Sequence, residues 1–470
     1  MTGRLSRRAF LGSFAAGAMS VLLGACTKVV KETVVVEKVV KETVEVEKIV
    51  KEEVQKEVTR VVEKAVEKEV TRVVPAGELR GEVLFWAWDE PISDLLKKGF
   101  ETKYPEVKVE YEMPQNYTQT FLASLVAGAG LPDCAWIDSN FYQKLARTGQ
   151  LIPMDEYLEP YKADILKFLW DGGLYEGVQY GVPRRYAPEV LWYRKDRYEE
   201  VGIDPESLKT WDDFMLEGKK AVDGTRFMST YDRNANPYIL QSMIFSKDGT
   251  GFFDSQDNVV VNSPENVACL EKFMELVKSG VLRQSEVWSP DWYNAAHQAI
   301  IACLVMPYWY GSEPRVEMPD TAGKWGILRI PSLKPGVQNA SIWQGAMFWV
   351  IPKQAKNKEM GWRFSEYTTF DYTDPFMQES MDREFVLPAY VKFMEIDYFW
   401  GDALLFFGEN LRKLAHELAQ GAPVNYLPPE YSEAESALVA EMQALYDGER
   451  SAQATLDAAA EAFKKLLEAR

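Results

Sequence analysis

Aromatic and polar side chains lie at the C-terminal ends of two apolar segments. Trp88 ends the run 82–88 and Asp89 follows it, and Asp138 and Asn140 follow the run 133–137. A flat aromatic ring can bind the C–H face of a sugar, and carboxylate or amide groups can bind its hydroxyls. These residues predict a site for a hydroxyl-rich solute, with core packing and strand-end capping as the structural alternative.

Further aromatic and polar residues lie near the ends of later apolar segments. The chain contains 14 tryptophans, of which Trp309 and Trp343, the latter followed by Gln344, are placed to extend such a site. Arg185 can donate charge-assisted hydrogen bonds, with Tyr186 beside it. Structural packing for Trp343 and Gln344, and a solvated surface for Arg185 and Tyr186, are the alternatives.

Residue types that enzymes use are scarce or lack a pattern. The two histidines, His297 and His416, fall on separate predicted helices, which does not support a His-based triad or a multi-histidine metal site. Gly128-x-Gly130 lacks the Lys-Ser/Thr of a phosphate-binding loop. We therefore predict no catalytic residue, no metal and no cofactor. The 71 acidic residues leave a glycoside hydrolase open, because such enzymes need only paired carboxylates.

The elements that position these residues alternate between strand and helix. Hydrophobic patterns predict strands at 82–88, 107–111 and 133–137, and helices at 92–104, at 121–127 and from 141 onward. This order implies an α/β domain with a mostly parallel sheet covered by helices, whose ligands bind beyond the carboxyl ends of the strands. Trp136 and Trp192 lie within apolar strands and are predicted to be core.

The N-terminus has the features of an export signal. Arg7 and Arg8 precede a weakly apolar run that is shorter than the roughly 20 strongly apolar residues of a spanning helix. The run ends in Leu23-Gly24-Ala25-Cys26, which resembles a lipoprotein cleavage site. We expect residues 1–25 to be a twin-arginine lipoprotein signal peptide and Cys26 to carry the lipid. An uncleaved anchor with a chance cysteine is the alternative.

Residues 26–78 are predicted to form a stalk. Segment 28–74 is built almost wholly from Val, Lys, Glu and Thr, and Val29–Lys38 recurs closely at Val39–Lys48. It has no aromatic residue and cannot bury enough surface to fold alone. From Val50 the apolar residues have helical spacing, so a helical spacer or a weak coiled coil is the alternative to a solvated stalk.

Composition limits the classes of partner. The net charge is −18; the signal holds three arginines and the stalk is neutral, which leaves about −21 for residues 75–470 and argues against nucleic acid or an anionic membrane surface. This region is long enough for two lobes. Cys134, Cys269 and Cys303 lack the spacing of a disulfide framework or zinc site and are predicted to be buried free thiols.

Short motifs follow one another along the chain in a characteristic order. They are Phe100–Val109, Ala127–Asp133, Leu145–Asp155, Tyr175–Pro183, Leu191–Asp196, Thr210–Phe214, Pro307–Trp309, Ile351–Lys358 and Asp447–Asp457. In this order they resemble the family-1 extracellular solute-binding proteins of ABC importers, the maltose-binding type. Two positions depart from the family pattern: His297-Gln298 replaces the usual Gly-Lys, and Arg194 replaces the usual Asn. We expect the first to alter a surface helix end and the second to alter the inter-lobe surface.

The resemblance implies a two-lobed, periplasmic-binding-protein-like fold of type II, with each lobe a mostly parallel sheet flanked by helices. Strands that cross near residues 188, 343 and 395 would divide the chain into an N-lobe and a C-lobe. The N-lobe would contain 79–188 plus 344–395, and the C-lobe 189–343 plus 396–470. The cleft between them would close on the solute.

The resemblance also implies a function. The chain would be an extracytoplasmic lipoprotein that captures a carbohydrate and delivers it to ABC transporter permease subunits; its aromatic content favours an oligosaccharide. It would be a monomer anchored to the cytoplasmic membrane by its lipid alone, without nucleic acid. A non-transport sugar-sensing or adhesion lipoprotein, and less so a glycoside-active enzyme, are the alternatives. The predicted ligand-binding residues, with Asn116 and the platform Trp309 taken from the resemblance, are Trp88, Asp89, Asn116, Asp138, Asn140, Arg185, Tyr186, Trp309, Trp343 and Gln344.

Overall fold

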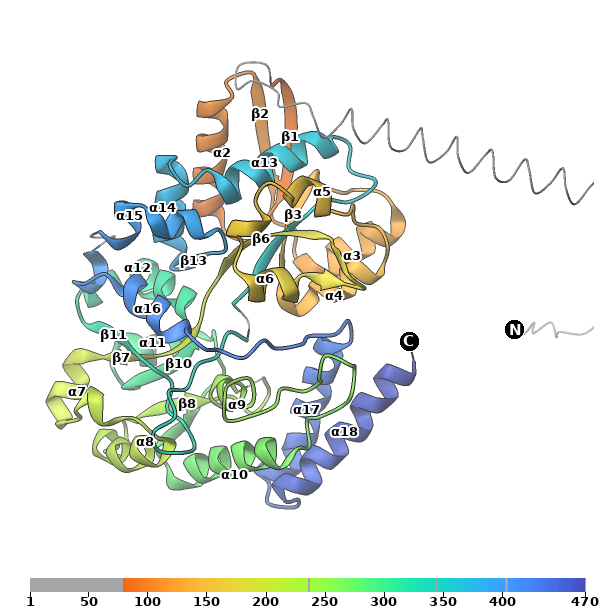
Figure 1. Cartoon of the computed structure of the whole chain (residues 1–470). Helices are drawn as coiled ribbons and strands as arrows, with labels where there is room; N and C mark the ends of the chain where they lie inside the picture. The colour runs from red at the N-terminus through yellow and green to blue at the C-terminus, as the bar shows by residue number, and fades with distance from the viewer. Residues whose placement is uncertain (1–78, 236, 344, 402–404, 470) are drawn as a thin grey trace, which may run out of the picture. The chain divides into compact units, whose positions relative to one another are not determined.

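The computed structural model describes residues 79–235, 237–343, 345–401 and 405–469, which belong to one compact unit that begins at Val74 (Figure 1). The predicted signal peptide, Cys26, the whole of the predicted stalk and Gln344 lie outside the described residues. Among the described residues, no helix has the length and apolar character needed to cross a membrane.

A six-stranded sheet forms the centre of the N-lobe (Figure 1). Its strands, in spatial order, are β13 (Leu387–Pro388), β6 (Gly181–Tyr186), β12 (Met347–Val350), β3 (Cys134–Asp138), β1 (Gly81–Trp86) and β2 (Val107–Glu112). β1 pairs in parallel with β2 and β3. β12 is antiparallel to β3 and β6, and β6 is antiparallel to β13. The parallel strands are the ones that helical crossovers join.

Helices cover both faces of this sheet. Successive residues of a strand point to opposite faces, so neighbouring residues of β1 contact different helices. Phe85 of β1 stacks on Phe364 of one helix, with ring centroids 4.5 Å apart. The next residue, Trp86, meets Phe121 on the other face at 5.9 Å. The helices of this lobe are α2 (Glu90–Lys103), α3 (Tyr117–Ala127), α4 (Ser139–Arg147), α5 (Asp155–Leu158), α6 (Lys167–Gly172), α13 (Lys358–Phe370) and α14 (Pro375–Glu384).

A three-stranded sheet forms the centre of the C-lobe. β7 (Glu189–Arg194) lies between β10 (Cys303–Pro307) and β11 (Trp325–Leu328) and is antiparallel to both. A separate parallel pair joins β8 (Ser229–Tyr231) to β9 (Leu282–Gln284). The helices that follow β7 outside the N-lobe are α7 (Lys195–Val201), α8 (Trp211–Gly218), α9 (Tyr238–Ile244), α10 (Pro264–Ser279), α11 (Pro290–His297), α12 (Ser312–Glu317), α15 (Asp397–Trp400), α16 (Leu411–Ala419), α17 (Tyr431–Tyr446) and α18 (Ala452–Glu468).

The segments that cross between the two sheets approach each other closely. β6 ends at Tyr186 and β7 begins at Glu189, so two residues join the N-lobe sheet to the C-lobe sheet. A second crossing leads from Trp343, which is buried in the C-lobe core, back to β12. A Cβ at Gly345 in this crossing would lie 1.9 Å from the carbonyl oxygen of Ala187 in the first. Glycine is therefore required for the two crossings to lie side by side.

Most predictions about the fold are confirmed, but the prediction that the sheets are mostly parallel is corrected. The βαβα order appears as β1, α2, β2, α3, β3 and α4. The three cysteines Cys134, Cys269 and Cys303 are buried and free, and Trp136 and Trp192 belong to the core. Parallel pairing is limited in the N-lobe sheet to β2, β1 and β3, and the described pairings of β7 are antiparallel. A hydrophobic pattern shows where a strand lies but contains no information about the direction of its neighbour.

Candidate ligand-binding site

An exposed tryptophan forms the aromatic part of the site in the N-lobe. Trp88 follows β1, and 39% of it is exposed. Its ring meets Tyr117 and Trp136 edge-on, with centroids 5.2 and 5.5 Å apart. The Tyr117 hydroxyl donates a hydrogen bond to the Trp86 carbonyl oxygen at 2.9 Å. Trp88 is thus held by its neighbours while part of its ring stays open to a ligand.

Arg185 of β6 lies among three carboxylates. Its Nε is 2.9 Å from Oε2 of Glu384, the last residue of α14. Burial lowers the pKa of Arg185, and the charges of Glu384, Asp138 and Asp89 oppose that shift. Glu384 also accepts hydrogen bonds from both terminal nitrogens of Arg184, at 2.7 and 2.6 Å. These ion pairs fix a guanidinium whose planar donors suit hydroxyl oxygens.

The two aspartates beside Arg185 have raised pKa values. Burial raises the pKa of Asp138, at the end of β3, to about 6, while the charge of Arg185 lowers it. Burial also raises the pKa of Asp89. The Oδ1 atom of Asp89 accepts a hydrogen bond from the backbone N–H of Ile92 at 3.0 Å and so caps α2. When ionised, both carboxylates can accept hydrogen bonds from ligand hydroxyls.

Two stacked tryptophans form the aromatic part of the site in the C-lobe. Trp309 follows β10 and Trp288 precedes α11; their ring centroids are 5.9 Å apart and their planes are inclined by 20°. Trp309 is partly buried and packs against core residues of both lobes, whereas 39% of Trp288 is exposed. Trp288 was not predicted from the sequence, because it lies in a loop that no predicted strand precedes.

The two lobes meet around these groups. Burial raises the pKa of Tyr238, at the start of α9; a hydrogen bond with Trp288 lowers this pKa, and the charge of Asp138 raises it further. The charges of Glu313 in α12 and Asp89 likewise act on each other across the lobes. Ser139, the residue after Asp138 in the sequence, lines an inter-lobe cavity of about 550 Å³. Other residues that line it are Gln143 and Phe168 from the N-lobe and Phe253, Trp343 and Tyr426 from the C-lobe.

The predicted residues that these contacts bring together are Trp88, Asp89, Asp138 and Arg185 of the N-lobe, whereas Trp309 stacks on Trp288 and packs against the cores of both lobes. The other predicted residues have different surroundings. Asn116 is exposed, and its side chain makes no capping hydrogen bond. Asn140 is partly buried, and its Oδ1 has no hydrogen-bond partner among the described residues. Tyr186 and Trp343 are each only 1% exposed; this burial favours packing for Tyr186, whereas Trp343 also borders the cavity.

The residues that could hold a metal are dispersed. Within the part of the chain that the structure describes, no group of three or more His, Cys, Asp or Glu residues could hold a metal ion. The two histidines lie on separate helices, as predicted: His297 ends α11 and pairs with Asp320 at 2.6 Å. His416 lies in α16, where burial lowers its pKa.

The sequence of residues 86–371, more than half of the chain, matches the family described as bacterial extracellular solute-binding protein. The chain belongs to this family. Its members and the relatives named below are binding proteins. The predicted family, and with it the two-lobed α/β fold, is therefore confirmed.

Individual relatives of this solute-binding protein bind sugars. The arabinooligosaccharide-binding protein of Halalkalibacterium halodurans is 27% identical over 300 residues, which cover 61% of this chain and 66% of that protein. The protein of the same name from Bacillus subtilis is 28% identical over 298 residues, 60% of this chain and 68% of that protein. The chain thus spans about two thirds of the length of these curated relatives. A binding protein from B. animalis subsp. lactis, solved with beta-1,6-galactobiose, has a TM-score of 0.69 at 20% identity, covering 83% of this chain and 97% of that chain.

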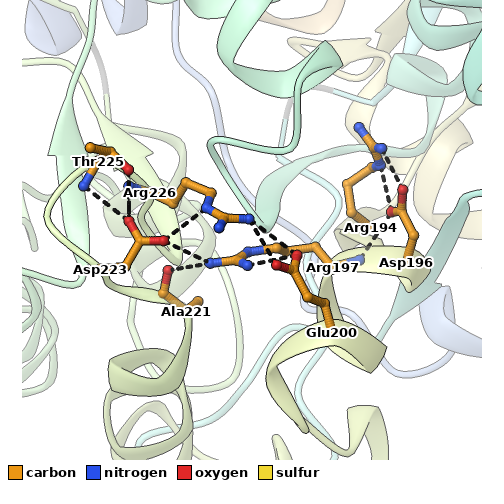
Figure 2. Close-up of polar contacts among 8 residues, drawn as sticks. All are labelled: Arg194, Asp196, Arg197, Glu200, Ala221, Asp223, Thr225 and Arg226. Atoms are coloured by element: carbon orange, nitrogen blue, oxygen red, sulfur yellow. Dashed lines mark hydrogen bonds and ion pairs between the residues drawn. The ribbon is translucent and has the colours of Figure 1, made fainter.

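One departure from the family pattern has a structural role within the C-lobe. Arg194 is buried and binds Asp196 through Nε and a terminal nitrogen, at 2.9 and 2.7 Å. It also donates to the carbonyl oxygens of Ala296 and His297, at 2.9 and 2.7 Å, in the last turn of α11. The expectation that Arg194 alters the inter-lobe surface is therefore wrong. In this solute-binding protein Arg194 caps the C-terminal end of α11, where the other departure, His297-Gln298, lies. Figure 2 shows the Arg194–Asp196 pair beside the ion pairs of Arg197, Glu200, Asp223 and Arg226.

The pKa of Asp138 predicts a pH-dependent affinity. If ligand hydroxyls donate to its carboxylate, binding strengthens as pH rises through about 6 and the ionised form becomes populated. The titratable groups that interact electrostatically with Asp138 are Arg185, Tyr117 and Tyr238. We expect the Kd of a neutral sugar to fall from about pH 5 to about pH 7.5, as measured by calorimetry at constant ionic strength. Asp138→Asn should remove most of this change; a wild-type Kd that does not vary with pH would contradict this role.

Proposed function

We propose that this chain is the extracytoplasmic substrate-binding component of an ABC importer, which captures an oligosaccharide between its lobes and delivers it to the permease. The observation that carries the proposal is an exposed tryptophan in each lobe: Trp88 contacts Trp136, on which Arg185 lies, and Trp288 stacks on Trp309. Aromatic rings suit the C–H faces of a sugar, and charged hydrogen-bonding groups suit its hydroxyls. The names of the two relatives favour an arabinooligosaccharide.

The proposed lobes are 79–188 plus 344–395 and 189–343 plus 396–470. In support, β6 and β12 belong to the N-lobe sheet, whereas β7, β10 and β11 belong to the other. A solute that binds groups of both lobes stabilises the closed arrangement by the difference between its affinities for the closed and open forms. The permease would then recognise the closed form.

The proposed location is outside the cytoplasmic membrane. Residues 1–25 would direct export, Cys26 would carry the lipid, and residues 26–78 would hold the monomeric binding protein away from the membrane. The family's description as extracellular supports export. Membrane release after replacement of Cys26 tests the anchor.

A thermal-shift screen tests the proposed ligand class. Residues 74–470 form one compact unit and are mixed with arabino-, malto- and galacto-oligosaccharides, with free amino acids and short peptides as controls. A ligand at a hundredfold excess over its Kd adds about 2.7 kcal/mol to the free energy of unfolding, so the melting temperature should rise with the correct oligosaccharide. A peptide-induced shift without any sugar-induced shift would refute the carbohydrate proposal.

A further inference from the structure

Trp288 has a backbone conformation that large side chains rarely adopt. Its φ is +68°, in the left-handed region, where the Cβ of an L-residue is crowded. A strained conformation persists only where its surroundings enforce it, and such positions cluster at ligand sites. The strain at Trp288 thus identifies a side chain whose direction is maintained at a cost in stability.

The neighbours of Trp288 fix its ring without covering it. The ring centroid lies 5.1 Å from that of Trp292 and 6.1 Å from that of Tyr293, and Tyr238 hydrogen-bonds its side chain. Even so, 39% of Trp288 is exposed. A rigid, partly open indole loses little conformational entropy when a ligand stacks on it.

Trp288 also extends the aromatic surface of Trp309 within the site. The two rings are nearly parallel, with centroids 5.9 Å apart, so the exposed Trp288 lies directly against the aromatic platform of the C-lobe. Trp309, on which Trp288 stacks, packs against buried core residues of both lobes. Trp288 therefore belongs to the surface that meets the N-lobe.

We propose that Trp288 determines ligand length by stacking on a second sugar unit, next to the unit that stacks on Trp309. This inference rests on the proposed function. Trp309 binds a sugar of any length, whereas Trp288 contributes only when the ligand has at least two units. The protein consequently selects oligosaccharides over the corresponding monosaccharide.

Calorimetric titration with arabinose, arabinobiose, arabinotriose and arabinotetraose tests the proposal. Trp288→Ala should weaken binding of arabinotriose about tenfold and change binding of arabinose by no more than about twofold. Trp288→Gly should give the same pattern, and glycine accepts the left-handed backbone without strain, so it separates loss of the ring from misfolding. Trp309→Ala should weaken every length that binds. Trp400→Ala removes another exposed tryptophan, from α15, and should leave every Kd unchanged.

The outcomes separate this inference from the proposed function. A wild type that prefers the longer sugars, with unchanged or uniformly weakened binding in both Trp288 variants, would overturn the length role while the proposed function stands. A wild type that binds no member of the series would overturn the arabinooligosaccharide proposal, and the length role with it.

Discussion

Replacing Glu384 by alanine is expected to lower the free energy of unfolding by about 3–5 kcal/mol. The carboxylate binds both terminal nitrogens of Arg184, whose side chain is fully buried, and Nε of Arg185. Arg184 would keep only its longer contacts, at 3.3 Å, to Thr368 and Ser380. Arg184 would then be buried beside a second guanidinium without its anion, and Arg185 would keep only the charges of Asp138 and Asp89, which costs more than the lost hydrogen bonds alone. Urea unfolding of residues 74–470 measures the change as a lower midpoint.

Glu379→Ala provides the matched control on the same helix. Glu379 pairs with Arg383, and both side chains are about 40% exposed, so solvent screens this pair and its loss should cost less than about 1 kcal/mol. Equal destabilisation by the two substitutions would contradict the importance assigned to burial at Glu384. An unchanged slope of the unfolding curve would confirm that both variants unfold between comparable states.

The fold could be predicted where its signals are local. The predicted run 82–88 overlaps the strand β1 at 81–86, and glycines 128 and 130 mark the end of α3, because apolar periodicity and turn residues act over a few positions. The direction of β10 and β11 relative to β7 could not be predicted in this way. Nor could the requirement for Gly345, which arises only where it meets Ala187, far away in the sequence.

The candidate site was predicted to a similar extent. Trp88 follows β1 and Asp138 ends β3, and parallel strands bring their carboxyl ends to one edge of a sheet. Trp309 follows β10 of an antiparallel pair, and the resemblance suggested its role. Glu384 was not predicted, because it reaches the site from a helix 200 positions after Arg184. Trp288 was not predicted either, because its exposed ring depends on a left-handed backbone at one loop residue. Contacts set by tertiary structure or by a single dihedral angle leave no periodic signal.

A Cys26→Ser variant is expected to move the protein completely from the membrane fraction to the soluble extracytoplasmic fraction. We place the lipid on Cys26, and each buried CH₂ of an acyl chain contributes about 0.8 kcal/mol to membrane binding. The segment 28–74 that follows balances eleven Lys and Arg against eleven Glu and has no aromatic residue, so it offers no replacement anchor. No helix of the described residues could cross a membrane either. Fractionation with immunoblotting measures the change.

Thr27→Ser is the matched control, because it alters the adjacent residue but keeps the cysteine. This variant should stay in the membrane fraction and release acyl chains on mass analysis, like the wild type. A Cys26→Ser protein that survives a carbonate wash of the membranes would show instead that the run 9–25 remains as an uncleaved anchor. Lipid attachment would suit capture and delivery better, because cleavage would leave only the acyl chains in the membrane. A solvated stalk would then let the binding lobes reach both free sugar and the permease.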